Sequence, residues 1–303
     1  MRICIVGAGA LGSLFGGLLA RAGASVALYN PSNVEHIRAI QSSGLILESN
    51  GTALQIPLEA ATTPDIVEGV DLVMIFVKAH QTACAMAQIA PKLAQRSWVL
   101  SLQNGFGMEE EILRWVPAER FLRGVTSQGA TMVGPGRVRW AGAGPTKLGR
   151  WSGPVVPMIE ELLALLRSAG IETEYSCEIE RLIWEKLLVS CAINPLTALF
   201  NQPNGSIISD PHLREIAEAV VREALRVASA HGVSMGEGEA LAWLETVARK
   251  TAQNISSMLQ DVRRGRPTEI DYINGAVVRA GRRLGIPTPL NLLLTQLIHQ
   301  RSQ

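Results

Sequence analysis

The sequence predicts an α/β domain with a doubly wound, mainly parallel sheet, followed by an all-α domain. A glycine-rich turn joins an apolar strand to a helix near the start of the chain. Short apolar strands then alternate with helical stretches through the first half, which is typical of a parallel sheet. After Cys177 the pattern is helical nearly throughout. Single cores stop growing near roughly 250–300 residues. We therefore expect two domains, 1–177 and 178–303.

The glycine-rich turn follows the apolar run Ile3–Val6 and precedes the helical stretch Ser13–Ala20. In a G-x-G-x-x-G turn the first glycine permits the tight bend, the second lets the backbone approach a pyrophosphate, and the third lets helix and strand pack closely. The helix N-terminus then offers unpaired N–H groups to phosphate. The pattern predicts a Rossmann-type dinucleotide site formed by Gly7, Ala8, Gly9, Ala10, Leu11 and Gly12.

Two polar residues follow later strands of the predicted sheet. Lys78 follows the strand Val70–Val77, and Asn104 comes after the strand Ser97–Leu102. A lone lysine at a strand end is commonly just a solvated side chain. Ligands of such sheets, however, bind beyond the carboxyl ends of the strands, where the predicted cofactor lies. That position favours a functional role for both residues.

The end of the second strand, Ser25–Tyr29, decides which cofactor is preferred. An acidic residue there favours NAD, whereas a nearby arginine accommodates the 2′-phosphate of NADP. This chain has neither at the strand end; it offers Asn30 and Ser32, with Arg38 further on in the next helix. The same residues could instead form an Asx turn around Pro31. The choice of cofactor stays open on these residues.

The remaining elements follow from turn and helix signals. Residues 124–149 are rich in glycine and β-formers, which predicts hairpins that finish the sheet, with its last strand at 171–175. Asp210 and the proline after it predict a helix start, and Gly232 its end. Pro289 precedes the last helix.

One helix of the second domain, from about residue 178 to 200, carries a polar stripe. Lys186, Ser190 and Asn194 are spaced four residues apart within an apolar stretch, so they share one face. Burial lowers the pKa of a lysine, which suits it to donate a proton. Alternatively, Lys186 extends its amine to solvent and Asn194 caps a helix break at Pro195. The helix alone favours neither reading.

Composition excludes several classes of protein. With 47% hydrophobic and 18% charged residues and a net charge of +1, nothing points to nucleic-acid binding. The first strand begins at once, leaving no room for a leader, and we count no apolar stretch of the roughly 18 residues that span a bilayer. We expect a cytoplasmic protein with no membrane partner. The four cysteines form no C-x-x-C pair, so neither a metal site nor a disulfide framework is expected.

The segment Asn254–Gly275 resembles the matching block of the ketopantoate reductases, and the resemblance extends over essentially the whole chain. Besides the glycine turn and the segment Asn254–Gly275, it covers Val77–Ala79, Gln103–Gly105, Lys186–Ala198 and Asn201–Gly205. The resemblance implies a Rossmann domain, a helical domain, and NADPH-dependent reduction of 2-dehydropantoate (ketopantoate) to (R)-pantoate, a step toward pantothenate and coenzyme A.

The resemblance also implies roles for individual residues. Lys186 would protonate the substrate carbonyl as hydride arrives at carbon, and Glu269 would hold the substrate hydroxyl, orient Lys186 and face the cofactor. Ser257 would contact the substrate carboxylate. Further substrate contacts would come from Asn104, Ser190, Asn194 and Asn204, and further cofactor contacts from Asn30, Ser32, Lys78 and Asn104.

Two departures from the family pattern bear on specificity. Ser190 replaces an asparagine that the family commonly carries, which leaves room for a different substrate side chain. The arginine after strand two is missing, so NADP(H) is expected on family grounds, with NAD(H) possible. Alternative functions are a reductase of another branched 2-oxo acid, or a non-catalytic nucleotide-binding regulator. The chain would act as a monomer or a homodimer.

Overall fold

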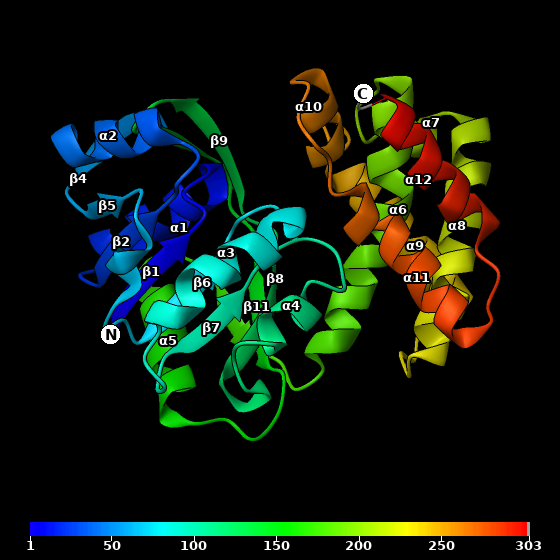
Figure 1. The fold of residues 1–303 in the computed structure, drawn as a ribbon. Coiled ribbons are helices and arrows are strands. Elements are labelled where there is room, and N and C mark those ends of the chain that lie inside the picture. Colours follow the sequence, from blue (N-terminus) through cyan, green and yellow to red (C-terminus); the bar gives the residue numbers. More distant parts are fainter. Residues whose placement is uncertain (302–303) are drawn as a thin grey trace. The chain divides into compact units, whose positions relative to one another are not determined.

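The structure is a computed structural model, in which residues 1–301 are described. The chain forms two compact units (Figure 1). The first comprises Met1–Gln103 and Glu109–Ile179. The second comprises Asn104–Met108 and the chain from Glu180 onward. The short segment Asn104–Met108 therefore leaves the first unit and returns to it, which the sequence pattern did not indicate.

The first unit is built on an eight-stranded sheet. All neighbouring strands are parallel except β8 and β11, which run antiparallel. The strand order reverses direction beside β1, as in a doubly wound sheet. The strands in spatial order are β12 (Thr173–Tyr175), β11 (Thr146–Arg150), β8 (Phe121–Thr126), β7 (Trp98–Ser101), β6 (Leu72–Ile75), β1 (Arg2–Val6), β2 (Ser25–Tyr29) and β5 (Glu59–Ala61).

Both faces of this sheet are buried, because alternate side chains of a strand point to opposite faces. In β1, Ile3 and Ile5 belong to one core cluster, whereas Cys4 and Val6 belong to another. This explains the continuous apolar runs in the sequence. The helices of the unit are α1 (Ala10–Arg21), α2 (Val34–Ser43), α3 (Thr82–Ile89), α4 (Glu109–Leu113) and α5 (Pro157–Ser168).

The glycine-rich region 124–149 only partly finishes the main sheet, which corrects the sequence-based expectation. β8 and β11 join that sheet, but the hairpin of β9 (Gly129–Gly134) and β10 (Arg137–Gly142) lies in a separate four-stranded sheet. There β10 pairs in parallel with β3 (Leu45–Ser49), which in turn pairs with β4 (Thr52–Ile56). The hairpin thus pairs with a strand, β3, that lies some ninety residues earlier in the sequence.

The second unit is helical, as the sequence predicts. Asp210 caps α8 by accepting hydrogen bonds from the backbone N–H groups of His212 and Leu213, and Gly232 follows the helix end with a positive φ of 85°. The helices are α6 (Ile179–Phe200), α7 (Ser206–Ser209), α8 (Pro211–Ala230), α9 (Glu237–Lys250), α10 (Ser257–Arg263), α11 (Asn274–Leu284) and α12 (Pro289–Arg301), with a short 3₁₀ turn η5 (Ile270–Tyr272) before α11.

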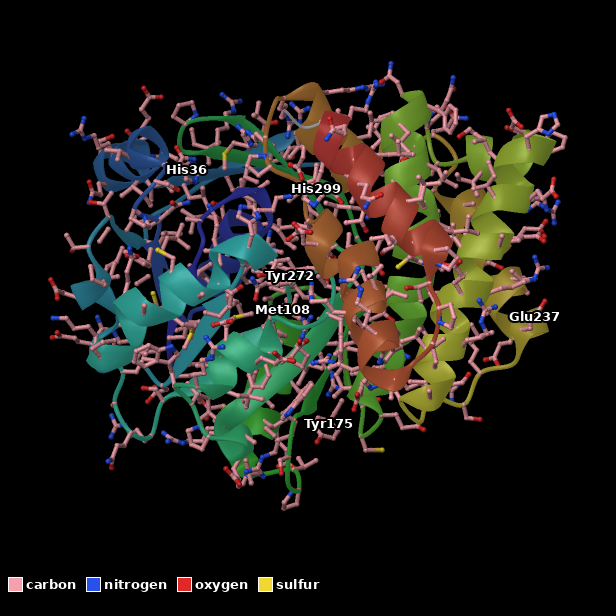
Figure 2. The ribbon with its side chains drawn as sticks, turned by 45° about the vertical axis from the view of Figure 1, so that its right-hand side comes forward. His36, Met108, Tyr175, Glu237, Tyr272 and His299 are labelled. Carbon is pink, nitrogen blue, oxygen red and sulfur yellow. The ribbon has the colours of Figure 1, made fainter. Side chains whose placement is uncertain are left out.

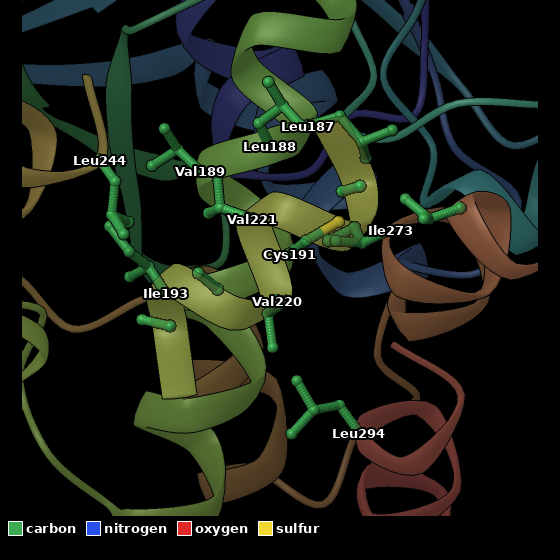
Figure 3. Packing of buried hydrophobic residues seen from close by; sticks show 14 of the residues in the cluster. Leu187, Leu188, Val189, Cys191, Ile193, Val220, Val221, Leu244, Ile273 and Leu294 are labelled. Carbon is green, nitrogen blue, oxygen red and sulfur yellow. The ribbon is translucent and has the colours of Figure 1, made fainter. Parts of the chain in front are cut away.

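Helix α6 corrects two expectations. It continues through Pro195, so no helix break occurs there and Asn194 caps none. Among the residues that the structure describes, it is also the one helix long and apolar enough to cross a bilayer, although 67% of its apolar window is buried inside the structure. That degree of burial is typical of a core helix. Figure 3 shows its residues Leu187, Cys191 and Ile193 among apolar side chains of the second unit.

Candidate active site

The glycine turn has the geometry that a pyrophosphate site requires. Gly7 has a φ of 100°, and a Cβ there would lie 2.4 Å from the Val77 backbone nitrogen. A Cβ on Gly12 would lie 2.3 Å from the Gly7 carbonyl oxygen. Around Gly9, by contrast, a Cβ would meet nothing within 4 Å. The first and third glycines therefore serve the fold, and the second leaves open space beside the N-terminus of α1.

No side chain caps α1, whose N-cap residue is Gly9. The first N–H groups of a helix need partners from outside it, and they attract anions together with the helix dipole. The turn is held on its other side because the Gly7 N–H donates to the Tyr29 carbonyl at the end of β2. The residues present thus fit a dinucleotide phosphate.

Asn30 is engaged in a local turn. Its side-chain oxygen accepts hydrogen bonds from the Ser32 backbone N–H at 3.1 Å, the Ser32 hydroxyl at 3.0 Å and the Asn33 N–H at 3.2 Å. This is the Asx turn around Pro31 that the sequence offered as the alternative reading. Arg38 is exposed on α2. The oxygen of Asn30 is therefore committed to the turn.

Gln103 joins the ends of β6 and β7, where Lys78 and Asn104 follow. Its buried amide donates to the Val77 carbonyl and to the Thr82 hydroxyl, both at 2.8 Å, and its oxygen accepts from the Ser101 hydroxyl at 2.9 Å. The residue before Lys78 and the residue before Asn104 are thus hydrogen-bonded to each other. Sequence reasoning missed this role, although the polar Gln103 at the end of an apolar strand was a signal.

A buried arginine supports the same edge of the sheet. Arg123 is 1% exposed and donates from Nε to Glu109 at 2.6 Å. Its Nη1 donates to the carbonyls of Ser101 at 3.2 Å and Gln103 at 2.9 Å. Burying a charge is costly unless it is paired and hydrogen-bonded, as it is here. The pair fixes the backbone that leads into Asn104, and nothing in the strand pattern of β8 predicted it.

Asn104 begins the short segment that belongs to the second unit. A Cβ on the next residue, Gly105, would lie 2.3 Å from the Tyr272 carbonyl oxygen, and the Phe106 N–H donates to that oxygen at 2.8 Å. The Phe106 ring packs on Trp184 of α6 with centroids 5.1 Å apart. Figure 2 labels Met108, the last residue of this segment, and Tyr272. The glycine thus permits a close backbone approach, which holds the segment on the turn that follows Glu269.

The polar stripe of α6 is half-buried, whereas the residues around it are buried. Lys186, Ser190 and Asn194 are each partly exposed, and Leu187 and Cys191 are fully or almost fully buried. The three polar side chains therefore share the face that the spacing predicts. Glu269 is 6% exposed and stands immediately before η5 in the same unit.

The two other predicted substrate residues are Asn204, which lies between α6 and α7, and Ser257 of α10. Asn204 is buried, and its amide nitrogen donates to the Thr251 hydroxyl at 3.0 Å, whereas its buried oxygen Oδ1 has no hydrogen-bond partner among residues 1–301. Ser257 is exposed as the first residue of α10. The N-cap is Ser256, whose hydroxyl accepts from the Leu259 N–H and shares a hydrogen bond of 2.7 Å with Thr197.

The predicted residues thus divide between the units. The first unit holds the glycine turn, Asn30, Ser32 and Lys78, and the second holds Asn104, Lys186, Ser190, Asn194, Asn204, Ser257 and Glu269. Within the part of the chain that the structure describes, no group of three His, Cys, Asp or Glu residues could hold a metal ion.

Known proteins match this chain over nearly its full length. Residues 3–153 match the family "Ketopantoate reductase PanE/ApbA", and residues 178–302 match its C-terminal domain. The 2-dehydropantoate 2-reductase of Halobacterium salinarum is 37% identical, with 98% of each chain covered, and that of Pyrococcus abyssi is 38% identical, covering 98% of this chain and 97% of the relative.

Two solved structures are similar throughout. D-mandelate dehydrogenase in a ternary structure with NADH and anilino(oxo)acetate superposes with a TM-score of 0.94 at 31% identity, covering 100% of this chain and 98% of that one. A PanE/ApbA family ketopantoate reductase from Ralstonia eutropha gives 0.91 at 34% identity and the same coverage. Sequence and fold agree that this chain belongs to the ketopantoate reductase family.

Proposed function

We propose that the protein reduces 2-dehydropantoate to (R)-pantoate with NADPH, in pantothenate and coenzyme A biosynthesis. The main support is the placement of Lys186. It is half-buried on the polar face of an otherwise buried helix, in the same unit as Glu269 and Asn104. The names of the curated relatives support this substrate. We further propose that residues 1–177 bind the dinucleotide and that residues 178–303 supply most of the side chains that bind the substrate. Asn104 adds a further substrate contact.

The residues of the second unit suit the chemistry of a 2-oxo acid. A nicotinamide cofactor held at the glycine turn supplies the hydride to the carbonyl carbon. Lys186 donates a proton from Nζ to the carbonyl oxygen as negative charge develops there, which is general acid catalysis. Glu269 accepts a hydrogen bond from the substrate hydroxyl and orients the lysine, so it acts on position rather than on the proton itself.

The carboxylate and the rest of the substrate need hydrogen-bond donors. The Ser257 hydroxyl is exposed at the start of α10 and is suited to a carboxylate. Asn104, Ser190, Asn194 and Asn204 supply amide and hydroxyl groups for the remaining oxygens. Asn204 fits a different contact, that of an acceptor for a substrate hydroxyl, because its buried Oδ1 has no partner within the described protein and is costly to bury unless a donor reaches it.

The choice between the two nicotinamide cofactors depends on the end of β2. We propose NADP(H), with NAD(H) as the alternative. The alternative is supported by a specific observation, since no arginine stands at the end of the strand to bind the 2′-phosphate. A charge-assisted hydrogen bond contributes about 1.5–3 kcal/mol, so its loss reduces discrimination by about 10- to 100-fold. The dinucleotide contacts proposed here are the glycine turn, Asn30, Ser32, Lys78, Asn104 and Glu269.

A second candidate function is reduction of another 2-oxo acid by the same apparatus. Two observations favour it: Ser190 stands where the family commonly has asparagine, and the similar D-mandelate dehydrogenase was crystallised with anilino(oxo)acetate, a different 2-oxo compound. Catalytic residues do not fix the substrate. A regulator that binds nucleotide without catalysis would have no use for Lys186 and Glu269. We propose a cytoplasmic enzyme, acting as a monomer or a homodimer.

The test is the loss of 340 nm absorbance with ketopantoate, with NADPH and NADH run in parallel on the purified protein. Turnover with NADPH supports the proposal, and turnover with NADH alone moves the cofactor to the alternative. A panel of branched and aromatic 2-oxo acids then ranks substrates by kcat/KM. Tight dinucleotide binding without turnover on any 2-oxo acid would refute an enzymatic function of this class.

A further inference from the structure

Pro195 creates a gap in the hydrogen bonds of the lysine helix. In an α-helix each N–H donates to the carbonyl four residues before it, and proline has no N–H. The carbonyl of Cys191 therefore loses its helical partner, although α6 continues through this point. Cys191 is 0% exposed, so water does not replace the missing donor. A buried carbonyl of this kind requires another partner.

The missing partner comes from α11. The amide nitrogen of Asn274 donates to the Cys191 carbonyl at 2.9 Å, and Asn274 is 0% exposed. Its second hydrogen goes to the Asn291 oxygen at 3.0 Å, and Asn291 in turn donates to Glu223 at 3.0 Å. Both hydrogens of one buried amide are thus used to join α11 to α6 and α12. Figure 3 shows Ile273, the residue before Asn274, beside Cys191.

The position of this bond connects the two residues with proposed catalytic roles. Cys191 lies on α6 between Ser190 and Asn194, five residues after Lys186, and Asn274 lies five residues after Glu269. Only the turn η5 and Ile273 separate Glu269 from Asn274. The turn itself packs on the helix through Ile270 and Ile273, which share the core of α6. Apolar contacts of this type would let the segment slide along α6, whereas a hydrogen bond to one carbonyl fixes its position along the helix.

We propose that Asn274 is a positioning residue that sets Glu269 relative to Lys186 by binding the carbonyl which Pro195 leaves open. This inference rests on the proposed function for its effect on catalysis. Asn274 touches neither substrate nor cofactor in this proposal. A displacement of about 1 Å in a reacting group can cost about 100-fold in rate. The expected effect is therefore larger on kcat than on the KM for the cofactor, because Glu269 is one of several proposed cofactor contacts and the glycine turn belongs to the other unit.

The first test is a double-mutant cycle on stability and kcat with Asn274→Ala and Pro195→Ala. Alone, Asn274→Ala lowers the thermal midpoint and lowers kcat by about 10- to 100-fold, with a smaller change in the KM for the cofactor. In the Pro195→Ala background a new backbone N–H supplies the Cys191 carbonyl. The stability cost of Asn274→Ala then shrinks, but its kcat loss persists, because the link to α11 is still absent.

A purely structural role gives a different result. In that case the kcat loss disappears together with the stability cost in the double mutant, and that outcome would overturn the proposal. Leu244→Ala in α9 is the matched control, since it removes buried volume from the same core but leaves both partners of the bond between Asn274 and Cys191 in place. It should lower the thermal midpoint and leave kcat within about twofold. Asn274→Ser, which keeps one donor, replaces Asn274→Ala if that variant does not fold.

Hydrogen exchange tests the same link without any substrate. Backbone amides of residues 266–273 should exchange at least tenfold faster in Asn274→Ala than in Leu244→Ala. Each variant is measured at the same temperature difference below its own thermal midpoint. Equal exchange in the two variants would refute the positioning role. A wild-type protein without turnover on any 2-oxo acid would refute the proposed function instead, and the exchange experiment would still decide whether Asn274 holds the Glu269 segment.

Discussion

Gly9→Ala should separate dinucleotide binding from folding. The three glycines of the turn differ in what surrounds them, since an added Cβ at Gly9 meets nothing within 4 Å, whereas one at Gly12 meets the Gly7 carbonyl at 2.3 Å. Gly9 also has a φ of −83°, which any residue adopts. The fold therefore has no need of glycine at this position, and the reason for it lies in a ligand that approaches the backbone.

The magnitudes follow from these contacts. An alanine at the N-cap position of α1 costs at most about 1 kcal/mol relative to glycine. For a unit of this size 1 kcal/mol shifts the thermal midpoint by about 2–4 °C. The new methyl group occupies the space of the pyrophosphate, and overpacking of that kind costs about 1–3 kcal/mol, which weakens binding by about 5- to 150-fold. Gly12→Ala, in contrast, forces the backbone apart and should lower both stability and affinity.

Fluorescence titration with NADPH and NADH measures the affinity, and thermal unfolding without ligand measures the stability. Gly142→Ala is the matched control, because a Cβ there also meets nothing within 4 Å and the residue ends β10 in the same unit. It should change neither quantity by much. Wild-type affinity in Gly9→Ala would mean that the dinucleotide phosphate does not bind beside this glycine, and the reasoning from open space would fail.

Three further predictions concern single side chains. Lys186→Ala should lower kcat by about 10²- to 10⁴-fold with an unchanged thermal midpoint, and near-normal turnover would remove it from the acid role. Gln103→Leu should lower the free energy of unfolding by about 1–3 kcal/mol in a denaturant titration and weaken NADPH binding, because the buried Thr82 hydroxyl and the part-buried Val77 carbonyl lose their donor. Burial lowers the pKa of His36, whose Nδ1 accepts from the Gly136 N–H. Stability is therefore complete above the unfolded-state pKa of about 6.5 and falls as the pH drops below it, because the unfolded chain takes up the proton first. Unfolding curves from pH 8 to 5.5 measure this loss, which should be absent in His36→Gln.

Local patterns predicted the elements that carry the site. The glycine turn follows from six consecutive residues, and the face shared by Lys186, Ser190 and Asn194 follows from helical periodicity alone. The functional roles of these residues stay predictions. Pro195 shows where local patterns fail, because a proline usually ends or kinks a helix, whereas here the helix continues and the Cys191 carbonyl is bound by a donor eighty-three residues after Cys191.

Pairings between distant segments could not be predicted from the sequence. The hairpin around Gly136 has the composition of any antiparallel pair, and nothing in it specifies β3 as the neighbour. Likewise, the glycines at 105 and 107 indicate a turn, but not that the turn lies against Tyr272. In both cases the deciding interaction is a backbone contact, which leaves little trace in side-chain patterns.

Binding of the cofactor phosphate and choice of cofactor and substrate depend on different kinds of groups in the proposed site. The cradle for the dinucleotide phosphate is made of backbone, held by close contacts at Gly7 and Gly12 that admit no side chain. The choice of cofactor and of substrate depends on exposed or half-buried side chains such as Asn30 and Ser190, whose replacement costs the fold little. Substitutions at such positions therefore change specificity more readily than reaction type. This asymmetry explains how one fold includes relatives named for ketopantoate and a similar structure named for mandelate, and it makes the substrate panel with both cofactors the most informative assay.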